Sequence, residues 1–202
     1  MALAYAGIDF QIREVDLKHK PREMLDISPK ATVPVLLNRD SSVLEESLDI
    51  LLWSISENDP DGWHDYPRGV LSLMVRLVSE NDDVFKEHLD HYKYSDRYPD
   101  ESQRSYREHC EVFLKKLEAQ LARTTFLFGG RMSYADVAIF PFIRQFSNVE
   151  PKWFLSSRYP KLRDWLSCFL ESRLFESIMK KYQPWQIEDR EICFSDSKVK
   201  CP

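Results

Sequence analysis

The spacing of apolar residues changes once along this chain of 202 residues, and that change constrains the fold more than any other feature. Up to residue 58 the apolar residues form short runs and alternations, as in strands and short helices, whereas from residue 70 they recur every three or four residues, as in amphipathic helices. Prolines and glycines between the two parts indicate a linker. The sequence therefore predicts a small α+β domain at 1–58, a linker at 59–69, an all-helical domain at 70–185 and an extended tail at 186–202.

Composition excludes several classes of protein. The hydrophobic fraction of 43% supports a packed core, while a net charge of −5 and a pI near 5.6 argue against a nucleic-acid partner. No apolar run reaches the roughly 18 residues that a membrane span requires, so we expect no membrane partner and a cytoplasmic location. The four cysteines follow no metal-ligand spacing, and we expect reduced thiols and no metal.

The run Val33–Leu37 is aliphatic and β-branched, which predicts a strand, but Pro34 lies near its start. A proline at this place often marks a cis peptide bond or a close approach, and either would expose the N–H and C=O of Val33 to a ligand. The alternative is an ordinary proline at a sheet edge. We favour the ligand interpretation because a second ligand-binding pattern follows closely.

That second pattern is Glu46–Ser47, which opens an amphipathic helix after a polar turn and a short apolar run. A serine at a helix start caps free N–H groups, and the same N–H groups can hold a carboxylate. A strand edge and a helix N-terminus together predict a site for a small acidic peptide. Lys20 and Lys30 are the nearby cations.

Thr32-Val-Pro-Val35 followed by Glu46–Ser47 resembles the glutathione site in the thioredoxin-like N-terminal domain of the glutathione transferase family. The resemblance implies that Val33, before the cis proline Pro34, pairs with the cysteinyl backbone of glutathione, and that Glu46 and Ser47 bind its γ-glutamyl end. Lys18-His-Lys20-Pro21 resembles a segment of omega-like members, which implies that Lys20 approaches the glycyl carboxylate.

The helical half carries a further motif. Ser133-Tyr-Ala-Asp136 resembles the family's structural capping box, in which Ser133 and Asp136 serve folding before chemistry. The helix that follows is apolar on nearly every side, which predicts burial in the middle of a bundle, and Pro141 should kink it. The resemblance also implies a homodimer through the two long helices at 70–94 and 102–123.

The N-terminal domain is expected to be incomplete. Met1–Gly7 reads as the end of a helix, with Gly7 at a position of positive φ. In the family a first strand and a catalytic Ser, Tyr or Cys precede that helix, so the resemblance implies that both lie upstream of Met1 and that this chain holds no catalytic residue. The alternative is a shortened form whose N-terminal half repacks.

The sequence thus predicts a glutathione S-transferase-like protein, with glutathione as co-substrate, that transfers a thiol or conjugates a small electrophile or mixed disulfide. A non-catalytic module for binding or assembly is the alternative, and a structural chaperone-like or channel role is the third hypothesis. Trp185, Arg76 and Tyr94 are weak candidates for an electrophile pocket. His88 and His91 beside Asp90 form a weak metal pattern, for which a solvated helix face is the favoured interpretation.

Overall fold

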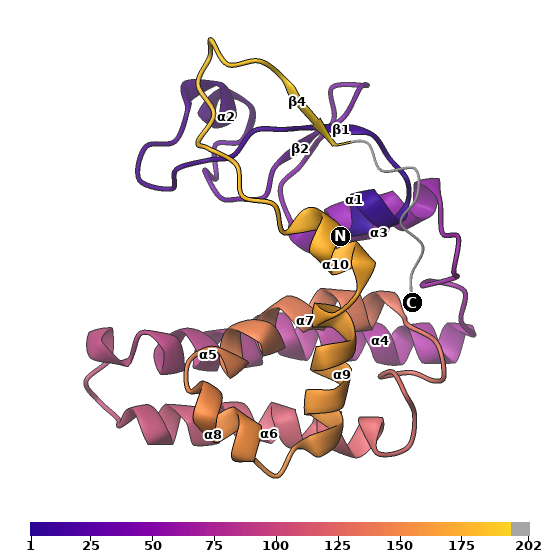
Figure 1. The fold of residues 1–202 in the computed structure, drawn as a ribbon, viewed down its shortest axis with the longest axis vertical. Coiled ribbons are helices and arrows are strands. Elements are labelled where there is room, and N and C mark those ends of the chain that lie inside the picture. Colours follow the sequence, from indigo (N-terminus) through magenta and orange to yellow (C-terminus); the bar gives the residue numbers. More distant parts are fainter. Residues whose placement is uncertain (195–202) are drawn as a thin grey trace. The chain divides into compact units, whose positions relative to one another are not determined.

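The computed structural model describes residues 1–194 and divides into two compact units (Figure 1). The first unit combines Met1–Asp61 with the segment from Ser172 onward, and the second unit spans Gly62–Glu171. The predicted boundary at residue 185 therefore differs from the observed division, because the chain after Glu171 packs with the N-terminal residues. Residues 195–202 of the predicted tail lie outside the described part of the chain.

The first unit contains short helices and two separate two-stranded antiparallel sheets. Strand β1 pairs with β4 in the register Phe10↔Phe194, and strand β2 pairs with β3 in the register Leu36↔Leu44. The elements are α1 (Ala2–Tyr5), β1 (Phe10–Ile12), α2 (Arg22–Ile27), β2 (Leu36–Leu37), β3 (Val43–Leu44), α3 (Ser47–Glu57), α10 (Arg173–Ile178) and β4 (Ile192–Phe194).

Helix α1 has only four residues, too few to be stable alone, and packing holds it. It lies against α3 and α10. The Tyr5 hydroxyl donates to Asp59 Oδ1 at 2.7 Å and accepts from the Asp61 amide at 2.8 Å. Gly7 follows with φ +67°, the left-handed conformation that its place after a helix requires. Helix α1 is therefore stabilised by the burial of its side chains and by the hydrogen bonds of Tyr5.

Strand β4 lies in the segment where the sequence shows no pattern. Its pairing with β1 places the Phe10 and Phe194 rings in a stack, with centroids 5.0 Å apart. The Gln11 side-chain amide also donates to Glu191 Oε2 at 2.8 Å. The C-terminal segment is thus part of the first unit as far as residue 194.

The second unit is all helical. Its first long helix runs through α4, a π-helical turn and α5, and the second is α6, as the apolar spacing predicted. The elements are α4 (Arg68–Glu80), η1 (Asn81–Phe85), α5 (Lys86–Lys93), η2 (Ser95–Arg97), α6 (Gln103–Leu121), α7 (Tyr134–Ser147), α8 (Pro151–Ser156) and α9 (Pro160–Leu170).

Helix α7 lies in the core of this unit. Ile139, Phe140 and Ile143 are almost completely buried, and α4, α5 and α9 pack against the helix. Pro141 lies inside it. The apolar pattern correctly indicated a largely buried helix, although Pro141 is exposed and Ala138 and Phe142 are only partly buried.

Asp136 connects three parts of the second unit. Its carboxylate is completely buried and accepts hydrogen bonds from the Leu127 amide (2.9 Å), the Trp165 Nε1 (2.9 Å), the Ser133 amide (3.0 Å) and the Ser133 hydroxyl (2.6 Å). A capping box with Ser133 is present at the start of α7. Burial raises the pKa of Asp136, while the donated hydrogen bonds oppose that shift.

Candidate functional site

The centre of the candidate site is the peptide bond Val33–Pro34, which is cis. Val33 is 47% exposed, and Pro34 lies two residues before Leu36, the first residue of β2. The β2–β3 register pairs Leu36 with Leu44. The ladder is confined to Leu36–Leu37 and Val43–Leu44, and α3 begins three residues after β3, at Ser47. The cis-proline segment therefore leads into one strand of this hairpin, and α3 follows the other.

Two side-chain contacts fix the loop before the cis peptide. The Ser28 hydroxyl donates to Glu45 Oε1 at 2.6 Å, and Ser28 is completely buried. Lys30 Nζ donates to Glu46 Oε1 at 2.9 Å, in an ion pair that is largely open to solvent. The hydrogen bond from Lys30 and the negative charge of Glu46 raise the pKa of Lys30. These contacts hold the loop against the residues that lead into α3.

The start of α3 differs in detail from the sequence prediction. Ser47 is the first helical residue, and Glu46 occupies the N-cap position without a side-chain capping hydrogen bond. The expected capping role of Ser47 is therefore wrong, because a residue inside the first turn cannot reach the N–H groups that a cap satisfies. Both side chains are exposed at the helix N-terminus, where backbone N–H groups favour negative charge.

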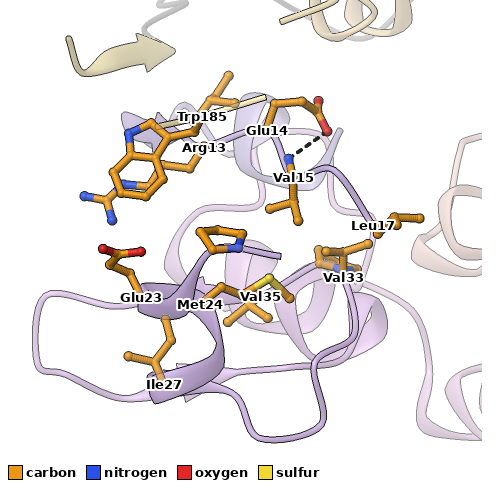
Figure 2. A pocket seen from close by; sticks show the side chains of 13 residues that line it. Arg13, Glu14, Val15, Leu17, Glu23, Met24, Ile27, Val33, Val35 and Trp185 are labelled. Carbon is orange, nitrogen blue, oxygen red and sulfur yellow. Dashed lines mark hydrogen bonds between the residues drawn. The ribbon is translucent and has the colours of Figure 1, made fainter. Parts of the chain in front are cut away.

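A pocket of about 440 Å³ lies within the first unit, beside the cis peptide. One side is formed by the chain that continues β1, and the other by Val33–Val35, with Met24 and Ile27 of α2 completing the lining. Figure 2 shows Glu14 and Val15 on one side and Met24 and Val35 on the other. Apolar side chains predominate, and a few charged ones lie among them, as is common for ligand pockets.

The predicted site residues divide into two groups. Val33, Pro34 and Trp185 line the pocket. Within the described residues, Lys20, Glu46 and Ser47 do not line it. Lys20 lies in the connection that precedes α2 and is partly buried.

Arg13 and Glu14 were not predicted as site residues, although both line the pocket with Trp185. The Arg13 guanidinium lies over the Trp185 ring, 4.4 Å from its centroid. The Trp185 amide donates to the Glu14 carbonyl at 2.8 Å. The only sequence signal for this part of the pocket was Trp185, a tryptophan beyond the last helix. The contact between Glu14 and Trp185 joins residues that are distant in sequence, and such a contact leaves no local sequence pattern.

Several other candidates lie elsewhere. Arg76 and Tyr94 belong to the second unit, and Tyr94 lies against the Arg97 guanidinium. Burial raises the pKa of the Cys110 thiol to about 12 and also raises that of Cys168, so neither forms a thiolate readily. Residues 1–194 contain no group of three or more His, Cys, Asp or Glu side chains that could hold a metal ion.

Two family models match parts of this chain. The model described as "Glutathione S-transferase, N-terminal domain" matches residues 1–56, and the one described as "Glutathione S-transferase, C-terminal domain" matches residues 99–168. The chain belongs to the glutathione S-transferase family. Its architecture is accordingly an N-terminal thioredoxin-like domain with a helical C-terminal domain, as the resemblance implied. The omega-like subtype stays a prediction.

This chain is similar to two plant proteins. It is 27% identical over 191 residues to "Probable glutathione S-transferase parA" of Nicotiana tabacum, covering 89% of this chain and 80% of the relative. It is 26% identical over 195 residues to "Glutathione S-transferase U19" of Arabidopsis thaliana, covering 89% and 81%. The chain therefore spans most of the length of both relatives.

Solved structures show the same fold. A glutathione S-transferase from Rhodospirillum rubrum F11 superposes with a TM-score of 0.73 at 19% identity, covering 91% of this chain and 86% of that one. A glutathione transferase from Phanerochaete chrysosporium, solved in complex with oxidized glutathione, gives 0.74 at 18% identity, with coverage of 87% and 85%. No helix within residues 1–194 has the length and apolar character needed to cross a membrane.

Proposed function

We propose that this chain binds glutathione at the exposed edge around Val33 and Pro34 and at the N-terminus of α3. The backbone N–H and C=O of Val33 pair with the cysteinyl residue, as a strand edge pairs with an extended peptide. Glu46 binds the γ-glutamyl ammonium, and Ser47 with the first-turn N–H groups binds its carboxylate. Lys20 is the proposed partner of the glycyl carboxylate.

The observation that supports this proposal most is the exposed cis-peptide segment, whose preceding loop is tied to the start of α3 by the contact between Lys30 Nζ and Glu46 Oε1 at 2.9 Å. Val33 is 47% exposed and lines the pocket. Membership of the glutathione S-transferase family supports the same ligand.

We further propose that the protein carries out glutathione-dependent thiol transfer or conjugation of a small electrophile or mixed disulfide. The thiol of glutathione loses its proton to solvent, and the thiolate forms the new bond. With a mixed disulfide the old S–S bond breaks and the displaced thiolate takes up a proton, whereas with an electrophile the leaving group departs with its bonding electrons. No residue of this chain is proposed to activate the thiol. A cytoplasmic homodimer, formed through α4, α5 and α6, belongs to the same proposal.

Glutathione binding measured by isothermal titration calorimetry tests the site. Ser47→Ala removes a hydrogen bond to a charged group, which is worth about 1.5–3 kcal/mol and weakens binding by about 10- to 150-fold. Glu46→Gln removes the charge that meets the ligand ammonium and weakens binding as well. Asp49→Asn is the matched control, because Asp49 is an exposed acid in the same helical turn.

The outcomes separate the competing functions. Binding by the wild-type chain that Glu46→Gln weakens and Asp49→Asn leaves unchanged supports the proposed site. A folded chain that does not bind glutathione refutes it and favours a non-catalytic module that uses the same fold. Binding that both substitutions weaken equally points to a general charge effect instead of a contact at Glu46.

A further inference from the structure

Helices α5 and α6 of the second unit pack against each other, and a pair of histidines meets across their contact. His88 belongs to α5 and His109 to α6. The centroids of the two imidazole rings are 5.2 Å apart, with an angle of 54° between the ring planes. The sequence pattern placed His88 together with His91 on one helix, whereas the structure places His88 beside a histidine of the neighbouring helix.

His91 has other partners. The centroid of its ring lies 4.1 Å from that of Tyr98 and 5.3 Å from that of Tyr106. It is therefore a histidine of the same helix, one turn beyond His88, that packs against tyrosine rings. This difference makes His91 a matched control for His88.

The π-helical turn η1 directly precedes α5 and affects which residues face α6. A π-helical turn bonds each residue to the fifth residue along the chain instead of the fourth, so it contains an additional residue and rotates the helix that follows. Such turns often lie at functional sites. In this chain the rotation sets which face of α5, and with it His88, meets α6.

The separation of the two rings suits a shared metal ion. Two imidazoles that bind one tetrahedral ion, each through one nitrogen at about 2.0–2.1 Å, have ring centroids about 5 Å apart. The observed separation of 5.2 Å agrees with this arrangement. His88 is only partly buried and His109 is exposed, so an ion can reach the pair from solvent.

The surroundings of the pair also favour a cation. Burial lowers the pKa of His88, and the neighbouring His109 and His91 lower it further, while the negative charges of Glu87 and Glu101 oppose this shift. A lowered pKa keeps the imidazole of His88 neutral at pH 7, which is the form that binds metal ions. The two glutamates supply negative charge close to the rings.

We propose that His88 and His109 bind a divalent transition-metal ion that prefers imidazole ligands, such as Ni²⁺ or Zn²⁺. Each ring supplies one nitrogen, and water supplies the remaining ligands, since residues 1–194 contain no group of three or more suitable side chains. The bound ion links α5 to α6. This proposal does not depend on the proposed function, because the pair lies in the second unit and the glutathione site in the first.

Glu101 has a positioning role in this site. Its Oε2 lies 3.7 Å from His109 Nε2 and accepts a hydrogen bond from the Ser105 hydroxyl. A carboxylate beside the second nitrogen of a metal-binding histidine orients the ring and raises its basicity. The nitrogen of His109 assigned to the ion is therefore Nδ1.

Isothermal titration calorimetry with NiCl₂ at pH 7.5 tests the site. The full chain is used without an oligohistidine tag and without glutathione, because both bind the ion themselves. We expect one saturable site for Ni²⁺ and no binding of Mg²⁺, which prefers oxygen ligands. Binding of Ni²⁺ should weaken by at least about tenfold at pH 5.5, since protonated imidazole cannot act as a ligand.

Three variants assign the ligands. His88→Gln and His109→Gln should each weaken Ni²⁺ binding by about tenfold or more, whereas His91→Gln should leave it within about twofold. In thermal unfolding, Ni²⁺ at 100 times its Kd should raise the Tm of the wild-type chain by about 5–10 °C and that of His88→Gln much less. Circular dichroism before the titration confirms that each variant is folded.

The proposal is overturned if the wild-type chain does not bind Ni²⁺ at pH 7.5 or binds Mg²⁺ equally well. It is also overturned if His88→Gln and His109→Gln bind Ni²⁺ as tightly as the wild type, which would assign the ion to another part of the chain. Equal weakening by His91→Gln would show a general effect of histidine content instead of a site at the pair.

Discussion

Replacement of Asp136 by alanine should destabilise the second unit more than any surface substitution. The carboxylate accepts four hydrogen bonds in a completely buried position, from Leu127, Trp165 and the amide and hydroxyl of Ser133. Alanine leaves three N–H donors without an acceptor, since the hydroxyl can rotate to another partner. Each buried unsatisfied group costs about 1–3 kcal/mol, which gives about 3–9 kcal/mol in total.

The net value lies near the lower end of that range. Burying an ionised carboxylate itself costs several kcal/mol, and Asp136→Ala removes this cost together with the hydrogen bonds. We therefore expect a loss of about 3 kcal/mol, which corresponds to about 6–12 °C in Tm for a chain of this size. Asp136→Asn should be intermediate, because its carbonyl oxygen can still accept from two of the donors.

Thermal and urea unfolding followed by circular dichroism at 222 nm measure the effect. Asp164→Asn is the control, because Asp164 forms only an exposed ion pair with Lys161, at 3.7 Å, and should change stability by less than about 0.5 kcal/mol. If Asp136→Asn and Asp164→Asn unfold at the same temperature, the hydrogen bonds to Asp136 do not hold α7 in place and the reasoning is refuted.

Other substitutions test contacts of the second unit. Ser102→Ala should cost about 1 kcal/mol in urea unfolding, because the Ser102 hydroxyl caps α6 by accepting from the Ser105 amide at 3.1 Å. Tyr159→Phe should cost about 1.5–3 kcal/mol, since its hydroxyl donates to Glu111 Oε2 at 2.6 Å in a buried position; an unchanged midpoint would contradict this. His88 has its pKa lowered by burial and by His109, so the unfolded chain binds its proton more readily; stability should therefore fall as the pH drops below the ordinary histidine value of 6.5, and less steeply in His88→Gln.

The helical unit was largely predictable from the sequence, because its core repeats along each helix. Phe85, Leu89 and Tyr92 are buried at spacings of three and four residues, and this periodicity extends through the π-helical turn that the sequence did not indicate. The sequence interpretation missed α8, although Pro151 at its start is a typical first helical residue. Six residues are too few for a periodic pattern to emerge.

The candidate site was predictable only in part. The cis peptide at Val33–Pro34 was expected from a proline at the start of an aliphatic run, and the structure contains it. The predicted strand Val33–Leu37 is shorter than expected, since β2 covers only Leu36–Leu37, and β1 is likewise short, at Phe10–Ile12. Strand length depends on partners, and the partner of β1 is the distant β4, which alternation within β1 cannot reveal.

The shortness of these strands has an energetic consequence for ligand binding. Two-stranded sheets of two or three residues are at best marginally stable by themselves, so the first unit depends on helix packing and on ties such as Ser28–Glu45. A ligand at 100 times its Kd stabilises the state that binds it by about 2.7 kcal/mol. The same binding energy is a larger fraction of the stability of a weakly held segment than of a helical core.

Because Val33 and Val35 have open backbone groups in the described structure, a ligand that pairs with them should protect the amides around β2 and leave those of α7 unchanged in hydrogen exchange. Equal protection in both regions would mean that the ligand binds elsewhere or stabilises the whole chain as one cooperative body.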